Sequence, residues 1–277
     1  MRFAPIILIL TLLISACGPE KEQKSTFKPE KKDNHVEVPD FKELIESSGL
    51  KGSLLIFDGT NFYSNDFKWA HKGHLPASTY KIPNSLIALE LGIMENDSTI
   101  SEWDGEPRYM KRWERDMYFR DAFHQSCVPC YQEIAREVGV RRMKDFVYKF
   151  NYGQMDIDSS NIDMFWLEGK SRISQFEQID FLRAFNEKRL LISDKTYETM
   201  RRMMIIEENE NFVLRGKTGW SVTKDQDNCW FVGWVETNKG QYYFATNIEP
   251  GPTTNADDLF IMRKEITYRA LELITIE

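Results

Sequence analysis

The sequence predicts an α+β fold, an α/β sandwich in which an antiparallel sheet is flanked by terminal helices and a helical subdomain lies beside the sheet. Strand-like runs of β-branched and aromatic residues gather near the two ends of the chain, whereas the middle is helical in pattern and poor in strands. The chain also closes on one long amphipathic pattern. Strands and helices segregated in this way indicate α+β, and 277 residues, 42% of them hydrophobic, suffice for one large domain or two intimate subdomains.

The N-terminal segment has the parts of an export signal. Arg2 precedes an apolar run at 6–14 that is too short to span a bilayer, and small residues then lead to Cys17. Because Ile-Ser-Ala-Cys resembles the cleavage box of bacterial lipoproteins, we expect residues 1–16 to be a signal peptide and Cys17 to carry a lipid; the alternative is an ordinary signal peptide with a chance cysteine. We therefore expect a protein that is exported to the periplasm and tethered to a bacterial membrane.

A tether and the first elements of the sheet follow. Residues 17–38 are rich in Lys, Glu, Pro and Gln and are expected to be flexible, so that the folded domain occupies 39–277. A short helix is predicted at 41–48, and a β-hairpin at 52–57 and 62–63 around an Asp-Gly-Thr-Asn turn.

The helix predicted at 78–91 is central to the fold. Its Ile and Leu residues cover nearly every side, which is typical of a buried helix, and Gly92 ends it. Pro83 removes a backbone donor near its start, so we expect the first turn to be irregular or tight.

A helical subdomain is expected at about 99–191, and the rest of the sheet follows it. Helices in this subdomain are predicted at 112–123, 129–138, 143–150 and 174–186. After them come a helix at 196–204, strands at 213–223, 229–236 and 242–248, and a terminal helix at 256–274.

Charge and histidine content exclude some functions. The net charge is −7 and no basic patch with interleaved aromatic residues is present, so we expect no nucleic-acid partner. The spacing of His71 and His74 could suit a metal, but no third ligand candidate lies nearby in the sequence. We therefore interpret this pair as part of a surface loop and expect no metal.

The sequence indicates no disulfide framework for the three cysteines of the folded part. Cys127 and Cys130 have CxxC spacing, but no second CxxC indicates zinc and no thioredoxin-like unit surrounds them. We favour small buried thiols that pack at a helix start, while a disulfide between them in an oxidising compartment stays open. The third, Cys229, leaves an odd count.

The candidate catalytic pair is Ser78 and Lys81. On a helix these residues are neighbours across one turn, a spacing that suits a nucleophile and the base that takes its proton. The Ser-x-x-Lys motif is short and arises by chance in many chains. Two further motifs make it specific: Ser126-Cys127-Val128, and Lys217-Thr218-Gly219-Trp220 on a predicted strand.

These three motifs, in this order, are the set shared by serine β-lactamases and penicillin-binding proteins. The segment 75–90 resembles the nucleophile segment of class D (oxacillinase-type) β-lactamases almost throughout, and the similarity extends from about Leu50 to the C-terminus. Further matching stretches are Ser126-x-Val128-Pro129-x-Tyr131-Gln132, Phe165-Trp166-Leu167-Glu168-Gly169 with Arg172-Ile173-Ser174, Lys217-Thr218-Gly219, Phe231-Val232-Gly233-Trp234 and Arg263.

The chemistry of Lys81 depends on its surroundings. Where many relatives carry Asn, the middle triplet here ends in the apolar Val128, and desolvation can lower the pKa of a lysine by about 3–5. A neutral amine reacts with CO2 to form a carbamate, and the class D resemblance implies that Lys81 is carboxylated in this way, with CO2 or bicarbonate as the only co-reactant. It also implies that Trp166 donates its indole N–H to the carbamate; the alternative is an aromatic residue that only packs.

The resemblance implies roles for the remaining site residues. The backbone N–H groups of Ser78 and Trp220 would form the oxyanion hole, and Ser126 would relay a proton to the leaving nitrogen. The substrate carboxylate would be held by the group Lys217, Thr218, Gly219 and Arg263. The alternative for Arg263 is a solvated helix face.

One position departs from the family pattern. Gln154 stands where the family usually has Asn, which leaves its role open.

Three functions are compatible with these motifs. The first function is hydrolysis of penicillin-type β-lactams by a monomer or homodimer, which confers antibiotic resistance. The others are a β-lactam sensor that stays acylated and a cell-wall transpeptidase. Sensors belong to longer chains with membrane spans, and Val128 together with Trp166 disfavours the transpeptidase.

Overall fold

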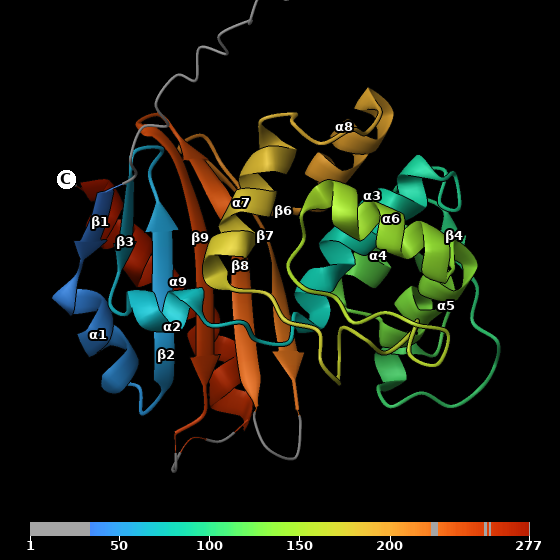
Figure 1. Cartoon of the computed structure of the whole chain (residues 1–277), viewed down its shortest axis with the longest axis horizontal. Coiled ribbons are helices and arrows are strands. Elements are labelled where there is room, and N and C mark those ends of the chain that lie inside the picture. Colours follow the sequence, from blue (N-terminus) through green and yellow to red (C-terminus); the bar gives the residue numbers. More distant parts are fainter. Residues whose placement is uncertain (1–33, 223–226, 252–253, 255, 277) are drawn as a thin grey trace, which may run out of the picture. The chain divides into compact units, whose positions relative to one another are not determined.

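The core of the fold is a sheet with the strand order β1-β3-β2-β9-β8-β7-β6 (Figure 1). The computed structural model describes residues 34–222, 227–251, 254 and 256–276. The strands of this sheet are β1 (Asn34–Glu37), β2 (Lys51–Phe57), β3 (Asn61–Ser64), β6 (Ile205–Glu208), β7 (Phe212–Ser221), β8 (Asn228–Thr237) and β9 (Gly240–Glu249). A small second sheet pairs β4 (Ile100–Ser101) with β5 (Met117–Tyr118).

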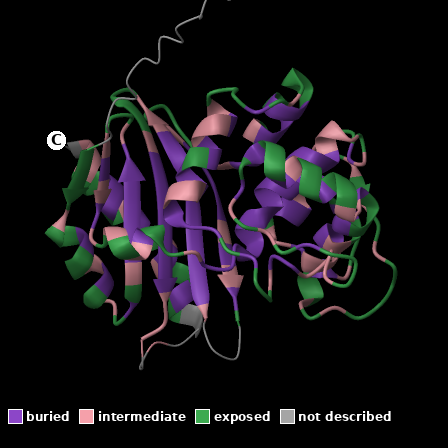
Figure 2. Cartoon of the chain, in the orientation of Figure 1, coloured by how far each residue is buried: buried purple, intermediate pink, exposed green. Residues whose placement is uncertain are grey.

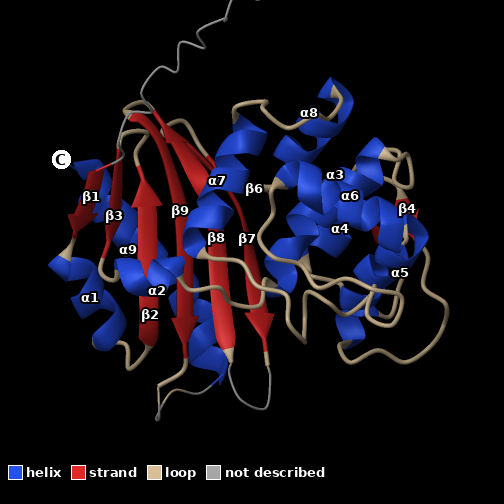
Figure 3. Ribbon diagram, in the orientation of Figure 1, coloured by secondary structure: helices blue, strands red, loops and turns tan. Residues whose placement is uncertain are grey.

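Helices lie on both faces of the sheet and in a block beside it (Figure 3). The α-helices are α1 (Pro39–Glu46), α2 (Phe67–His71), α3 (Lys81–Glu90), α4 (Phe119–His124), α5 (Val128–Val138), α6 (Val140–Phe150), α7 (Gln175–Asn186), α8 (Asp194–Met203) and α9 (Ala256–Ile276). Two 3₁₀ turns are η1 (Ala77–Tyr80) and η2 (Lys111–Trp113). Helices α1 and α9 cover one face of the sheet, and α2 and α7 cover the other.

Both faces of the central strands are therefore buried (Figure 2). In β2, Leu54 and Ile56 pack toward α1 and α9, whereas Leu55 and Phe57 belong to the larger core on the opposite face. Successive side chains of a strand point to opposite faces, so a strand buried on both sides needs the continuous apolar run that this segment has. The predicted sandwich of one sheet between terminal helices is confirmed.

Local sequence signals account for several element boundaries. Ser174 begins α7 with a capping box, in which its hydroxyl accepts from the backbone of Glu177 and the Glu177 carboxylate accepts from the backbone of Ser174. The expected tight start of the central helix is also present, because η1 precedes α3.

Three segments differ from the prediction. The segment 34–37, expected to be tether, forms β1 and pairs in parallel with β3. Residues 112–123 are not one helix but η2, β5 and α4 in succession. Helix α7, expected in the helical block, packs on β9 and β8 instead. Local pattern does not reveal these outcomes, because pairing and docking depend on partners distant in the sequence.

The surface-loop interpretation of the histidine pair is wrong for His74. Its imidazole is buried and stacks on Trp69 at 5.3 Å between ring centroids, while its backbone exchanges two hydrogen bonds with Ile173. Burial lowers the pKa of His74 to about 4, so this histidine is neutral at physiological pH. Among the described residues, no group of three or more His, Cys, Asp or Glu could hold a metal ion.

The predicted signal peptide and the lipidated Cys17 lie outside the described residues. Within the described ranges, no helix is both long and apolar enough to cross a membrane.

Candidate active site

The turn that carries Ser78 is held in a strained conformation. Ala77, directly before it, has φ 51°, an angle that residues with a side chain seldom adopt. The Ala77 N–H donates to the carbonyl of Trp166 at 2.8 Å, and the Thr79 hydroxyl donates to the carbonyl of Pro76 at 2.6 Å. The surrounding contacts thus fix a backbone strain of the kind that clusters at functional sites, with Ser78 only 7% exposed at the wall of a cavity.

Lys81 lies one turn further on and is 1% exposed. Its Nζ is 3.3 Å from the Ser78 Oγ, to which it donates a hydrogen bond, and 4.8 Å from the centre of the Tyr131 ring. Burial lowers the pKa of Lys81 from 10.5 to about 7, because the ammonium form loses its hydration. A substantial fraction of this amine is therefore neutral at physiological pH, as the sequence predicted.

Ser126 and Lys217 meet from different parts of the chain. Ser126 also has a positive φ, 52°, and its Oγ accepts a hydrogen bond from the Lys217 Nζ at 2.5 Å. The same ammonium donates to the carbonyl of Thr218 at 3.0 Å. Burial first, and then the positive charges of Lys81 and Arg263, lower the pKa of Lys217 well below its usual value. Val128 follows Ser126 by two residues, is half-buried and lines the same cavity.

The favoured interpretation of Cys127 and Cys130 as free thiols is wrong, because the two form a disulfide at the start of α5. CxxC spacing permits this bond when the second cysteine lies in the first helical turn, and here Cys127 is the N-cap. Cys229 is a free, buried thiol.

Strand β7 runs directly along the nucleophile turn. A Cβ on Gly219 would lie 3.2 Å from the backbone nitrogen of Ser78 and 3.2 Å from the carbonyl oxygen of Pro76. A Cβ at these distances would be tighter than most Cβ contacts, so glycine favours this approach, which brings the Lys-Thr-Gly-Trp segment beside Ser78. The structure therefore unites the three motifs of the sequence at one place.

Arg263 is not on a solvated helix face. It is 4% exposed, and its Nη1 donates to the carbonyl of Gly219 at 2.8 Å. Burial lowers the pKa of Arg263 from its ordinary value, yet a guanidinium stays charged at neutral pH. A buried cation that lines the cavity beside Thr218 is suited to receive an anionic group.

Trp166 is fully buried beneath the nucleophile turn. Its ring stacks on Tyr80 at 5.6 Å between centroids, and its backbone carbonyl receives the N–H of Ala77. The indole Nε1 has no hydrogen-bond partner among the described residues. A buried N–H without an acceptor is costly, so this indole is a candidate hydrogen-bond donor.

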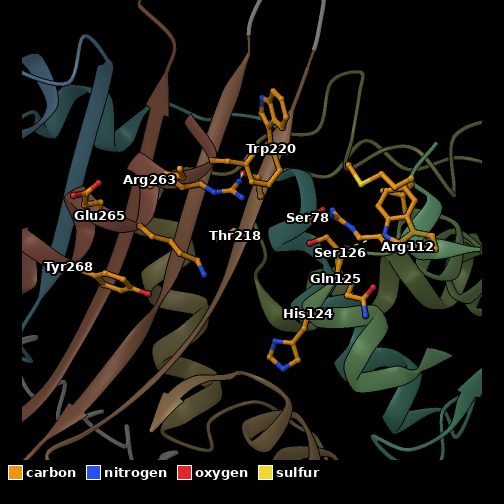
Figure 4. A pocket seen from close by; sticks show the side chains of 17 residues that line it. Ser78, Arg112, His124, Gln125, Ser126, Thr218, Trp220, Arg263, Glu265 and Tyr268 are labelled. Atoms are coloured by element: carbon orange, nitrogen blue, oxygen red, sulfur yellow. Dashed lines mark hydrogen bonds between the residues drawn. The ribbon is translucent and has the colours of Figure 1, made fainter. Parts of the chain in front are cut away.

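The cavity at this site has a volume of about 810 Å³ (Figure 4). Helix α9 and β7 form one side of it, and the segment around Ser126 with η2 forms the other. Among the site residues expected from sequence, those that line it are Ser78, Ser126, Val128, Thr218, Gly219, Trp220 and Arg263, whereas Lys81, Lys217 and Trp166 lie behind its wall.

Several lining residues had not been predicted. Phe260, Lys264 and Tyr268 follow one another at a spacing of four on α9, on a face that adjoins Arg263, so helical periodicity could have found them. Arg112 and His124 also line the cavity, and no local signal in the sequence marks them.

Residue 154 contributes through its backbone. Gln154 and Arg172 exchange two backbone hydrogen bonds of 2.8 Å, and the Gln154 side chain is exposed. The neighbouring Gly153 has φ 56°, and a Cβ there would lie 2.7 Å from the carbonyl oxygen of Arg172. The glycine is therefore required at this bend, while the amide side chain of residue 154 is free to vary.

Comparisons with known proteins agree with this geometry. The model of the penicillin binding protein transpeptidase domain matches residues 42–272. The chain is 40% identical over 210 residues to β-lactamase OXA-48 of Klebsiella pneumoniae, which covers 76% of this chain and 77% of that protein. The crystal structure of the class D β-lactamase YbXI from Nostoc matches with a TM-score of 0.80 and 40% identity, covering 85% of this chain and 98% of that chain. The class D β-lactamase from Sebaldella termitidis matches with a TM-score of 0.84 and 31% identity, covering 88% and 99%.

The fold and the site define a serine acyl-transfer protein of the penicillin-binding transpeptidase type. Within this type, the chain belongs to the class D (OXA-type) β-lactamases, enzymes that hydrolyse β-lactams through a serine acyl-enzyme.

Proposed function

We propose that this chain hydrolyses penicillin-type β-lactams with Ser78 as the nucleophile and an N-carboxylated Lys81 as the general base, and that it thereby confers antibiotic resistance. The observation that carries the proposal is the buried Lys81 amine, 3.3 Å from the Ser78 hydroxyl and with its pKa lowered to about 7. The residues fit a carboxylate on Nζ, because the unpartnered indole N–H of Trp166 supplies a buried donor near the same turn. When present, the carboxylate supplies a general base at Lys81.

Acylation begins when the Ser78 hydroxyl loses its proton and its oxygen attacks the β-lactam carbonyl carbon. The backbone N–H groups of Ser78 and Trp220 receive the oxyanion, an arrangement supported by the close approach of Gly219 to Ser78. As the intermediate collapses, the C–N bond breaks and Ser126 delivers a proton to the departing nitrogen. The Lys217 ammonium, which donates to the Ser126 Oγ, is placed to restore that proton.

The substrate is held by its carboxylate. At the cavity, Arg263 provides a positive charge, Thr218 a hydroxyl and Gly219 the close approach of the strand. Lys217 lies behind the wall, donates to Ser126 and supports the substrate carboxylate from there. Lys264 and Arg112 add further positive charge around the cavity, which favours anionic substrates.

Deacylation needs a water molecule that is activated next to the ester. The apolar Val128 lines the same cavity as Ser78, and burial disfavours the ammonium form of Lys81, which leaves a neutral fraction of the amine available for carboxylation. A sensor protein differs at this step alone, since it acylates and does not release the product.

Location and assembly form part of the same proposal. We infer export to the periplasm, a lipid anchor at Cys17 after removal of residues 1–16, and a tether that ends before β1, so that the catalytic domain begins near residue 34. The chain acts as a monomer or homodimer with a small-molecule substrate and contacts a membrane only through its lipid.

The test is hydrolysis of a chromogenic cephalosporin in buffer depleted of CO2 and then supplied with bicarbonate. We expect turnover that bicarbonate stimulates and that the Lys81→Ala variant lacks. A stable acyl-enzyme without turnover, seen by mass spectrometry in the presence of bicarbonate, would instead establish a sensor.

A further inference from the structure

The Cys127–Cys130 disulfide lies within the acyl-transfer site. Cys127 is the middle residue of the Ser-x-Val triplet, and both of its neighbours, Ser126 and Val128, line the cavity. Cys130 is followed by Tyr131, whose ring lies 4.8 Å from the Lys81 Nζ. A single covalent bond therefore joins the segment that presents Ser126 to the helical turn that packs against Lys81.

The Cys127 N–H donates to the carbonyl of Ala122 at 2.9 Å, but the noncovalent contacts on the helix side of Cys127 are weak. Cys127 occupies the N-cap of α5, where a hydroxyl or carboxylate would normally accept a backbone N–H, and its sulfur receives the Cys130 N–H at 3.3 Å. The first helical hydrogen bond, from Tyr131 N–H to the Cys127 carbonyl, is long at 3.4 Å. Ser126 has a positive φ, which costs energy for a residue with a side chain. The disulfide compensates for this weak start of the helix.

Global stability does not explain the bond. A disulfide that joins residues only three positions apart closes a very short loop, and the entropy that it removes from the unfolded chain is correspondingly small. Its main effect is local, on the shape of the turn from Ser126 to Tyr131. That turn is anchored on its far side by Tyr131, whose hydroxyl shares a 2.7 Å hydrogen bond with Ser85 and whose carbonyl accepts from Asn84 at 3.3 Å, both on the Lys81 helix.

We propose that the Cys127–Cys130 disulfide is a positioning element of the catalytic site, which holds Ser126 against Lys217 and keeps the start of α5 closed over the buried Lys81. The first consequence concerns proton delivery during acylation, because Ser126 must stay within hydrogen-bond distance of the Lys217 Nζ. The second concerns the base and rests on the function proposed above.

The effect on the base follows from hydration. If the first turn of α5 opens, water reaches Lys81 and the ammonium form becomes more favourable. Only the neutral amine combines with CO2. At pH 7 about half of this amine is neutral, and a tenfold smaller acid dissociation constant of the ammonium would lower that fraction to about one eleventh, roughly fivefold. The bicarbonate concentration for half-maximal activity then rises by the same factor.

The test compares the wild type with the Cys127→Ala/Cys130→Ala double variant. Two quantities are measured at pH 7: the acylation rate constant from single-turnover kinetics, and the bicarbonate concentration that gives half-maximal turnover. The control is Glu236→Gln, which weakens a 2.9 Å ion pair with Arg215 and an acceptor for Trp234 far along the sheet from Ser78.

Wild-type protein treated with dithiothreitol serves as a second test if the double variant does not fold. In that exchange the two thiols of the reagent pass two electrons and two protons to the S–S bond and close into a cyclic disulfide.

We expect the double variant or the reduced wild type to acylate more slowly and to need about fivefold more bicarbonate, while Glu236→Gln keeps wild-type values of both. If both quantities stay within twofold of wild type, although alkylation and mass spectrometry show loss of the disulfide, the bond has no positioning role. If turnover by the wild type does not depend on the bicarbonate concentration, the carboxylated base is refuted. The acylation rate constant then decides the role of the disulfide by itself: a slower rate supports it and an unchanged rate overturns it.

Discussion

The indole N–H of Trp166 offers the sharpest test of the base. The Trp166→Phe variant keeps an aromatic ring between Tyr80 and Phe165 but removes the one polar atom, which has no partner among the described residues. A hydrogen bond from a neutral donor to a buried anion contributes about 1.5–3 kcal/mol. At about 1.36 kcal/mol per factor of ten, its loss should weaken carboxylation of Lys81 by about 10- to 150-fold.

Two assays measure this effect. In the first, turnover of a chromogenic cephalosporin is followed against bicarbonate, and the half-saturating concentration should rise by the stated factor. In the second, the melting temperature is measured with and without bicarbonate. The wild type should be stabilised, since a group that binds only the folded state shifts the unfolding equilibrium, and Trp166→Phe should show a much smaller shift. In the Trp166→Phe variant, the rate constant of deacylation should fall more than that of acylation.

The matched control is Trp234→Phe. Trp234 is also fully buried, and it lies outside the cavity. Its replacement by Phe removes the hydrogen bond that its indole N–H donates to Glu236 at 3.0 Å. This variant should be less stable than the wild type and should keep the wild-type bicarbonate dependence. If Trp166→Phe has the same bicarbonate dependence and deacylation rate as Trp234→Phe, the indole N–H of Trp166 does not hold the base.

Three further predictions follow from the site. Ser78→Ala should lower turnover by at least about 10³-fold, because no other group can form the acyl-enzyme, and mass spectrometry should find no covalent adduct. Lys81 has a lower pKa in the fold (about 7) than its ordinary 10.5, so the unfolded chain binds more protons between these values and stability should rise with pH there. In CO2-free buffer, the free energy of unfolding by urea is measured for the wild type and for Lys81→Met, and the difference between the two should rise by about 1.4 kcal/mol per pH unit. A difference that does not change with pH would contradict the desolvated amine. Arg263→Ala should reduce kcat/KM by about 10- to 150-fold through loss of a charge-assisted hydrogen bond, whereas Arg269→Ala, on the exposed face of the same helix, should leave steady-state kinetics unchanged.

Much of the fold followed from local patterns. The continuous apolar run of β2, the apolar surface of α3 and the capping residues of α7 are local features, so these elements could be located in the sequence without knowledge of their partners. The edge strand β1 could not, because its four exposed residues carry no apolar pattern and form a strand only through pairing with β3.

Some residues of the site could likewise be found from the sequence, whereas others could be found only from the structure. Ser78 and Lys81 are adjacent on a helix, and their motif, together with the two later ones, identified the reaction class before any distance was known. Arg112 and His124 belong to no motif and enter the cavity only because η2 and α4 fold next to Ser126. The exposed alternative for Arg263 and the surface-loop interpretation of His74 failed for one reason: burial is a property of the assembled core and not of the residue type.

The sequence by itself determined the α+β arrangement and the family, because these rest on periodicity and on short motifs that chemistry constrains. Only the tertiary structure decided the state of the groups in those motifs. The lowered pKa of Lys81, the buried charge of Arg263, the unpartnered indole N–H of Trp166 and the bond between Cys127 and Cys130 all depend on which segments meet. Desolvation and contact arise from packing across the whole chain, and no local stretch of residues contains that information.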